Sequence, residues 1–362
     1  MNPQGGTLMV RRLIGVVVVA YWSSVASAGY IFNGYSYEII EFPESPYAYV
    51  STYDINSHGQ FCGNYRSPMT GESQAFLWDP IDGLIDIPTP TMGSVAQALN
   101  DRGEVVGAYY TDFPPDGPVG AAYVWDASNG LHELDTPGMS LPAATSINNS
   151  GLVVGLNLYK PWGEGSFYYD TSTGFVVPPS VDDPYNPLSI NNHGVAGGQF
   201  YDGTTRTQPA RWTLGGEHEL LALPDVAWRG WVMDIADDGT AVGRYNSIGS
   251  NAVGYAVWLP DGTVVDLGLI HPYGASFITI SPDGTVLYTD ADLHPFLWTP
   301  ETGPVSLIDD LFYWTSGAIN ADGTIVLSSR DDNEVFYLTP IPTPATIALI
   351  CCAIPFAMRR GR

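Results

Sequence analysis

The stretch Ala98-Leu99-Asn100-Asp101-Arg102-Gly103-Glu104-Val105-Val106-Gly107 decides the fold of this chain. Asn-Asp-x-Gly between alternating apolar residues predicts a β-hairpin whose turn has glycine at a positive-φ position. Two further apolar segments follow, at 122–126 and 131–134, and each has the length and pattern of a strand. We therefore predict a unit of four antiparallel strands.

This unit recurs along the chain. Its copies are 39 to 48 residues apart, close to the ~40–45 residues typical of a propeller blade. In six copies an aromatic residue marks the third strand, as Trp78 and Trp125 do. The turn glycines of the seven copies are Gly59, Gly103, Gly151, Gly194, Gly239, Gly284 and Gly323.

The two ends of the repeat region complement each other. The seventh copy has a third strand at 335–338 but no fourth strand, whereas an unpaired strand-like segment precedes the first copy at 37–43. Pairing them would close the ring and remove the open sheet edges. We predict an all-β, seven-bladed β-propeller with four antiparallel strands per blade, its last blade closed by the N-terminal strand. An open row of sheets, or a ring of six or eight blades, is the alternative.

Three stretches carry a resemblance to a known family: 74–79 (Gln-Ala-Phe-Leu-Trp-Asp), 98–107 and 146–155. They resemble the HAF repeats of bacterial extracellular proteins, with Gln-Ala-Phe in place of His-Ala-Phe, and the resemblance extends from about 48 to 340. Later copies such as 281–285 are closer to the turns of WD40-like and TolB-like propellers. The resemblance implies an exported repeat protein and supplies no catalytic residue.

The N-terminus has the pattern of a signal peptide, which we assign to 1–28. Arg11 and Arg12 precede an apolar run from Leu13 to Trp22, and Ala26-Ser27-Ala28 has the small-x-small form of a cleavage site. The run is too short to span a bilayer, which takes ~20 residues. A buried N-terminal helix is the alternative interpretation.

The C-terminus, 341–362, has three parts: Pro342-Thr343-Pro344, an apolar run from Ala345 to Met358, and a final Arg359-Arg360-Gly361-Arg362. This order resembles the PEP-CTERM sorting tail, with Thr343 in place of the usual Glu, and implies processing by an exosortase-type enzyme. An apolar segment followed by cations is also expected to stop in a membrane with its positive end cytoplasmic. The propeller domain is then 29–340, and the only predicted membrane contact is through the tail.

The charge of the predicted mature domain excludes one class of partner. Five of the 13 basic residues lie in the two terminal segments, so eight remain against 38 acidic ones and the net charge approaches −30. Such a surface repels nucleic acid. We expect a monomer whose partner is an extracellular glycan or a surface protein.

Cysteines suggest no chemistry in the domain. Cys351 and Cys352 lie in the tail, which leaves Cys62 alone on a second strand, where sister copies have Val106 and Val154. We predict that Cys62 is a small buried hydrophobic residue.

Binding residues are expected on the loops at the face opposite the repeated turns, since loops on a rigid scaffold usually carry function. Aromatic and polar side chains there could bind a glycan, because flat rings stack on sugars and polar groups orient them. The same aromatics could instead pack between blades. The candidates are Tyr185, Trp228, Arg229, Trp231, His271, Tyr273 and Trp314.

Two acids are candidates for the central channel. Asp54 and Asp234 occupy the same position of the innermost strand, where sister copies have Ala98, Ser146, Ser189, Thr279 and Ala318. They are the first acids to test if the protein is an enzyme, although a structural role is the simpler interpretation.

Metal and cofactor motifs are weak. The histidines are scattered without the spacing of a zinc site. The acidic stretches 237–239 and 331–334 could hold calcium weakly, but they lack the order of a calcium loop. We predict no cofactor and no metal site.

Together these observations predict an exported, envelope-anchored propeller that acts as a surface or matrix binding module, with a glycan as one candidate ligand. The alternatives are a polysaccharide hydrolase or lyase with carboxylates at the channel, and a purely structural matrix protein. The sequence favours the module that is not an enzyme.

Overall fold

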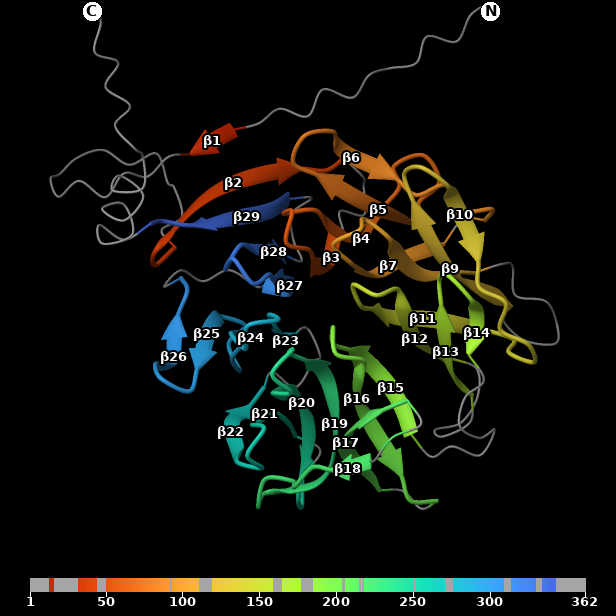
Figure 1. The fold of residues 1–362 in the computed structure, drawn as a ribbon. Coiled ribbons are helices and arrows are strands. Elements are labelled where there is room, and N and C mark those ends of the chain that lie inside the picture. Colours follow the sequence, from red (N-terminus) through yellow and green to blue (C-terminus); the bar gives the residue numbers. More distant parts are fainter. Residues whose placement is uncertain are drawn as a thin grey trace, which may run out of the picture.

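The computed structural model describes residues 13–15, 32–43 and 50–342, except for 92, 111–118, 159–164, 177–184, 204–205, 215, 217, 251, 271–275, 309–313 and 330–333. Across these residues the chain forms strands and turns and no helix. No described helix therefore has the length and apolarity to cross a membrane. The strands form seven antiparallel sheets, which follow one another around a ring (Figure 1).

Each of the first six sheets is one blade of four consecutive strands. Blade 1 comprises β3 (Val50–Ile55), β4 (Phe61–Arg66), β5 (Ser73–Asp79) and β6 (Gly83–Asp86). Blade 2 comprises β7 (Ser94–Leu99), β8 (Val105–Tyr110), β9 (Gly120–Asp126) and β10 (Gly130–Glu133). Blade 3 comprises β11 (Pro142–Ile147), β12 (Leu152–Asn157), β13 (Ser166–Asp170) and β14 (Gly174–Val176).

The next three blades repeat this order. Blade 4 comprises β15 (Tyr185–Ile190), β16 (Val195–Tyr201), β17 (Thr207–Thr213) and β18 (His218–Leu220). Blade 5 comprises β19 (Ala227–Ile235), β20 (Ala241–Ser247), β21 (Val253–Trp258) and β22 (Val264–Leu269). Blade 6 comprises β23 (Ile278–Ile280), β24 (Val286–Thr289), β25 (Pro295–Thr299) and β26 (Gly303–Ser306).

Blade 7 joins the two ends of the repeat region, as the sequence predicts. β27 (Trp314–Ile319), β28 (Ile325–Ser329) and β29 (Glu334–Pro340) are completed by β2 (Tyr35–Glu41), which runs antiparallel to β29 over its full length. A short strand, β1 (Leu13–Gly15), pairs with the outer side of β2. β1 lies within the predicted signal peptide, whose removal stays a prediction.

The closing strand also holds the ring together through its side chains. Ile40 and Phe42 are buried in one cluster with Val335 of blade 7 and with Phe61 and Phe76 of blade 1. The ring of Phe42 lies 4.8 Å from that of Phe76, between centroids. The closure predicted from 37–43 is therefore confirmed in both hydrogen bonding and packing.

The core lies between blades. Trp78, Trp125, Trp212, Trp258 and Trp298 of the third strands are all buried, and most of the apolar clusters combine residues of two adjacent blades. Cys62 is fully buried in the cluster between blades 1 and 2, so its prediction as a small hydrophobic residue is confirmed. Because blades pack face to face, each innermost strand is left beside the central channel.

A β-bulge distorts the innermost strand in six blades. The pairing of the first two strands skips one residue in five of them, and in blade 5 it skips one residue at each of two points. The bulge turns a carbonyl toward the second strand, which explains a recurring glycine there. A Cβ on Gly63 would lie 1.9 Å from the Ser51 oxygen, and one on Gly243 would lie 2.1 Å from the Trp231 oxygen. Bulges of this kind re-aim side chains.

Candidate functional site: the central channel

Two cavities occupy the centre of the ring and meet at a shared layer of side chains. The turn-side cavity, of about 340 Å³, lies at the ends of the innermost strands that lead into the repeated turns. The loop-side cavity, of about 390 Å³, lies toward the opposite ends of these strands. The residues that line both cavities, here called the belt, are Asp54, Ser146, Ser189, Asp234 and Thr279. The structure thus brings both sequence-predicted channel acids to the same layer.

Asp234 is held by four hydrogen bonds. Oδ1 accepts from the Ser189 hydroxyl at 2.8 Å and from its neighbour Ile235 N at 2.9 Å. Oδ2 accepts from the Thr279 hydroxyl at 2.8 Å and from Ile280 N at 3.1 Å. Because these donors come from blades 4, 5 and 6, Asp234 ties three blades together. Its acceptor sites are largely occupied by the protein itself.

Asp54 has the same position in blade 1 but fewer partners. Oδ1 accepts from Ile55 N at 2.8 Å, and Oδ2 accepts from Leu99 N of blade 2 at 2.9 Å. Burial raises its pKa from 3.8 to about 7; hydrogen bonds from Leu99 and Ile55 oppose this shift, and the charge of Asp234 adds to it. Asp54 therefore retains acceptor capacity toward the channel and titrates near neutral pH.

The turn asparagine of the repeat bridges neighbouring blades. Its Oδ1 accepts main-chain N–H groups of its own turn, as Asn148 does from Ser150 and Leu152. Its Nδ2 donates to the equivalent carbonyl of the next blade at 2.8–3.1 Å. These bridges run from Asn320 to Asn56, Asn100, Asn148, Asn191 and finally Ala236. Sequence reasoning explained this asparagine only by its turn conformation.

A second circle of bonds follows one residue later and forms the rim of the turn-side cavity. In each case a main-chain N–H donates at 2.9 Å to the side-chain oxygen of the next blade. The donors and acceptors run from Ser57 to Asp101, Asn149, Asn192 and Asp237. Burial works to raise the pKa of Asp101, but hydrogen bonds from Ser57 and Asn149 outweigh it, and the pKa lies below its ordinary value. These side-chain oxygens therefore already accept hydrogen bonds that join adjacent blades.

The loop-side cavity has a different lining. One bulge residue from each of the six blades reaches it, and this set comprises Tyr53, Gln97, Thr145, Leu188, Met233 and Thr315. Arg244 of β20, Ser276 and Phe277 complete one side. Apart from Asp54 and Asp234, no residue that lines this cavity is among the candidates drawn from the sequence. A bulge is set by pairing between strands, so one sequence gives little sign of it.

None of the aromatic candidates that the structure describes lines either of these two cavities. Trp314 is fully buried against Phe32 and Phe336, with ring centroids 6.1 and 5.0 Å away, so its assignment as a ligand-binding residue is wrong. It faces the interior because the blade 7 sheet is covered at this point by the segment that precedes β2. Its indole contributes to packing between blades 6 and 7.

The other described candidates lie outside both cavities. The Tyr185 ring stacks on the imidazole of His218, with centroids 4.0 Å apart, across the surface of blade 4. The guanidinium of Arg229 lies 4.5 Å above its neighbour Trp228, and Trp231 Nε1 donates to Met233 Sδ at 3.1 Å. His271 and Tyr273 lie outside the described residues.

The acidic stretch 237–239, considered for calcium, is engaged in local bonds. Asp237 accepts from both nitrogens of Asn192, and Asp238 accepts from the amide and hydroxyl of Thr240. The residues 331–333 of the second stretch are outside the described part of the chain. Neither acidic stretch is assigned as a metal site.

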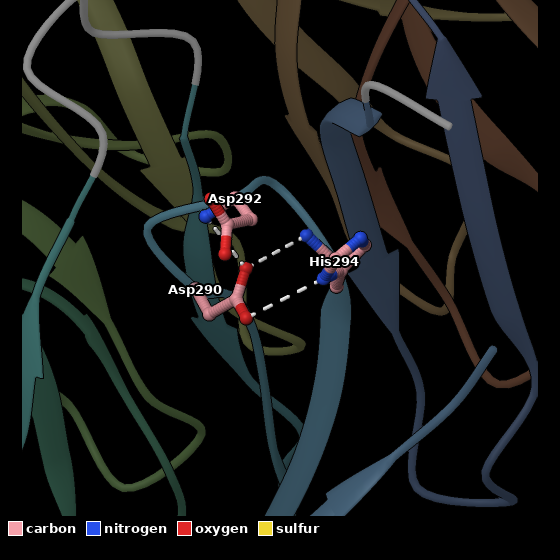
Figure 2. Close-up of side chains that lie close together, drawn as sticks. All are labelled: Asp290, Asp292 and His294. Carbon is pink, nitrogen blue, oxygen red and sulfur yellow. Dashed lines mark hydrogen bonds and ion pairs between the residues drawn. The ribbon is translucent and has the colours of Figure 1, made fainter. Parts of the chain in front are cut away.

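A third group, which sequence reasoning missed, lies in the turn between β24 and β25 (Figure 2). Asp290, Asp292 and His294 gather their ligand atoms within 4.8 Å of one another. Asp290 Oδ1 accepts from the main-chain N–H groups of Asp292 and His294, both at 2.9 Å, around Leu293 at φ 67°. These bonds explain why the three side chains lie together, since the Asp290 carboxylate caps the turn that carries the other two.

Comparisons with known proteins establish the fold alone. No protein-family model and no curated protein matches the chain. Among solved structures, virginiamycin B lyase from Staphylococcus aureus aligns over 85% of this chain and 100% of its own, with 12% identity and a TM-score of 0.55. The propeller domain of the Trilobed protease from Pyrococcus furiosus aligns over 84% and 99%, with 10% identity and a TM-score of 0.53. That domain is described as having an open velcro topology, whereas β2 closes the ring here.

Proposed function

We propose that this chain is an exported, envelope-held propeller that acts as a surface or matrix binding module, with the central channel as its recognition site. Export and retention rest on the signal-like pattern of 1–28 and the sorting-tail pattern of 341–362. The channel is proposed as the site because it is the concave, polar region at which all the blades converge, and ligand sites favour such positions.

The observation that carries the proposal is the free acceptor capacity of Asp54 within a belt of hydroxyl groups. Each Asp54 oxygen receives one hydrogen bond from the protein, and Ser146, Ser189 and Thr279 share its layer. The described lining of the turn-side cavity contains carboxylates, amides and hydroxyls, and no basic side chain. Such groups fit the hydroxyls of a glycan, which donate to carboxylates and accept from amides. In this proposal polar contacts in the channel, rather than the aromatic side chains expected from the sequence, recognise the sugar.

A glycan array followed by calorimetry would test this proposal. We expect Asp54→Asn to weaken the binding of any glycan found by at least tenfold. The control is Asp170→Asn, which changes a carboxylate that caps an exposed turn of blade 3 through Ser172 and Thr173. A chain that binds no glycan, or an Asp54→Asn variant that binds as well as Asp170→Asn, would refute the proposal.

One observation favours a second candidate, a polysaccharide hydrolase or lyase. A carboxyl group with a pKa of about 7 can exchange a proton near neutral pH, and Asp54 lies in the same layer as a second carboxylate, Asp234. Asp54 would be the proton-transferring group, since Asp234 is occupied by its four donors. Release of new reducing ends from a polysaccharide, abolished by Asp54→Asn, would favour this candidate over pure binding.

A further inference from the structure

The loop-side cavity has one polar wall and one apolar wall. At the inner edge of each blade, one half-buried side chain lines this cavity, and most of its neighbours along the chain are buried. In blades 7, 1, 2 and 3 this side chain carries a hydroxyl or an amide, whereas in blades 4, 5 and 6 it is apolar. The polar wall is Thr315, Tyr53, Gln97 and Thr145, and the apolar wall is Leu188, Met233 and Phe277.

The belt beneath the cavity follows the same division. Asp54 lies in blade 1, on the side of the polar wall, and each of its oxygens receives one hydrogen bond from the protein. Asp234 lies in blade 5, on the side of the apolar wall, and its oxygens receive four. The belt hydroxyls on that side, Ser189 and Thr279, already donate to Asp234. Acceptor capacity for a ligand is therefore concentrated beside the polar wall.

Leu188 is the part of the apolar wall that the fold needs least. Among the described residues, it belongs to none of the buried apolar clusters. It is also the residue that the pairing of β15 with β16 skips, and the skipped residues of blades 2 and 3 are Gln97 and Thr145. Strand pairing thus does not require an apolar side chain at this position. A leucine facing a cavity gains stabilisation only when something apolar covers it.

The rest of the apolar wall is held in place by its neighbours. Met233 and Phe277 each pack against the edge of an interblade cluster, and Met233 Sδ accepts from Trp231 Nε1 at 3.1 Å. Arg244 lines the cavity beside this wall, and one of its terminal nitrogens donates to the Ser276 carbonyl. The wall is therefore a fixed surface that is formed before a ligand arrives.

We propose that the loop-side cavity binds a 6-deoxyhexose unit of a glycan, with its methyl group on the apolar wall and its hydroxyls toward the polar wall. This inference rests on the proposed function and names the class of its ligand. A hexose with a 6-hydroxyl would lose water from that group against the apolar wall without a replacement hydrogen bond. A methyl group at the same place gains from burial. The cavity, of about 390 Å³, has the size of a small-molecule site.

Two pairs of sugars that differ only in the 6-hydroxyl test the proposal. Calorimetry of the full chain would compare L-fucose with L-galactose and L-rhamnose with L-mannose. We expect one deoxy sugar to bind about tenfold more tightly than its 6-hydroxy counterpart, the discrimination typical of a single group in an apolar pocket. This comparison uses the unmodified chain, so it stays decisive even if a variant fails to fold.

Leu188→Asn should abolish the preference, since its amide offers the 6-hydroxyl a hydrogen-bond partner. Leu188→Met keeps the wall apolar and should retain the preference. The matched control is Leu220→Asn, which makes the same change on the exposed outer strand of blade 4 and should leave the preference intact. Equal effects of Leu188→Asn and Leu220→Asn would overturn the assignment of the apolar wall.

The polar wall is tested by Gln97→Met. We expect this variant to weaken both members of the preferred pair at least threefold without changing the ratio of their affinities, because it removes a partner of the hydroxyls that the two sugars share. A change of the ratio as large as that caused by Leu188→Asn would overturn the division into two walls.

The outcomes separate this proposal from the proposed function. Equal affinities within both pairs, or N-acetyl-D-glucosamine binding as tightly as the preferred deoxy sugar, would overturn the 6-deoxyhexose site but leave glycan binding in place. The same holds if none of the four sugars binds while the array yields a glycan whose binding depends on Asp54. Absence of binding by all four sugars, together with a blank glycan array, would overturn the proposed function as well.

Discussion

Replacing Asn148 with alanine should destabilise the propeller by about 2–3 kcal/mol. Asn148 is 3% exposed; its Nδ2 donates to the Asn191 carbonyl at 3.0 Å, and its Oδ1 accepts from Leu152 N at 3.0 Å. Each of these two bonds contributes about 1 kcal/mol, and the groups left behind are shielded from water. Two further bonds, from the amide and hydroxyl of Ser150, are only partly buried and add less.

Urea denaturation followed by tryptophan fluorescence would measure this loss, because the third-strand indoles are buried between blades. The matched control is Asn129→Ala, in an exposed turn where the amide contacts only Asp126. That variant should change the free energy of unfolding by no more than about 0.5 kcal/mol. If Asn148→Ala and Asn129→Ala lose the same amount, the amide bridges do not hold the blades together, and the asparagine is only a turn residue.

Three further predictions concern closure, the channel acid and the bulges. Ile40→Asp should lower the melting temperature markedly and Glu41→Ala should not, because Ile40 is buried against blade 7 whereas Glu41 is exposed; equal melting curves would contradict the closure by β2. Since Asp54 has a folded-state pKa of about 7 against 3.8 unfolded, its stabilising contribution is complete below pH 4 and is lost as the pH rises through 7. The loss is at most about 4 kcal/mol, and water in the channel reduces it. The difference in the free energy of unfolding between wild type and Asp54→Asn, measured in urea, should therefore change between pH 4 and 7. A constant difference would show that Asp54 has the pKa of an ordinary carboxyl group. Gly107→Ala should cost about 1–3 kcal/mol in the same assay, since its Cβ would lie 1.9 Å from the Val95 carbonyl, and an unchanged midpoint would mean that the bulge relaxes freely.

The repeat could be predicted because each blade is encoded locally. The seven turn glycines all have positive φ, so the feature used to count the blades is a conformational requirement of each hairpin. The closing strand could also be predicted, because an unpaired strand at one end matched a missing strand at the other. Asp54 and Asp234 could be placed in one layer for a similar reason, since equivalent positions of a repeat occupy equivalent places in the ring.

The features that the sequence-based predictions missed or placed wrongly all depend on contacts between blades. In the sequence, Trp314 looks the same as an exposed aromatic residue that binds a ligand. Its contacts with Phe32 and Phe336 in the folded chain make it part of the core. Arg244 carries no motif, and its place in the lining of the loop-side cavity depends on the packing of blade 5 against blade 6. The asparagine bridges join residues 43 to 48 positions apart and in one case 264. The sequence shows the repeated asparagine, but only the packing of adjacent blades shows which carbonyl its amide reaches.

The sequence by itself determined the seven-fold repeat, the strand pattern within each blade and the strand that closes the ring, because hairpin turns and alternating burial act over a few residues. Tertiary structure decided which polar groups are satisfied and which are left to face the channel. That choice depends on the packing of one blade against the next, since the same aspartate type is tied by four donors at Asp234 and by two at Asp54.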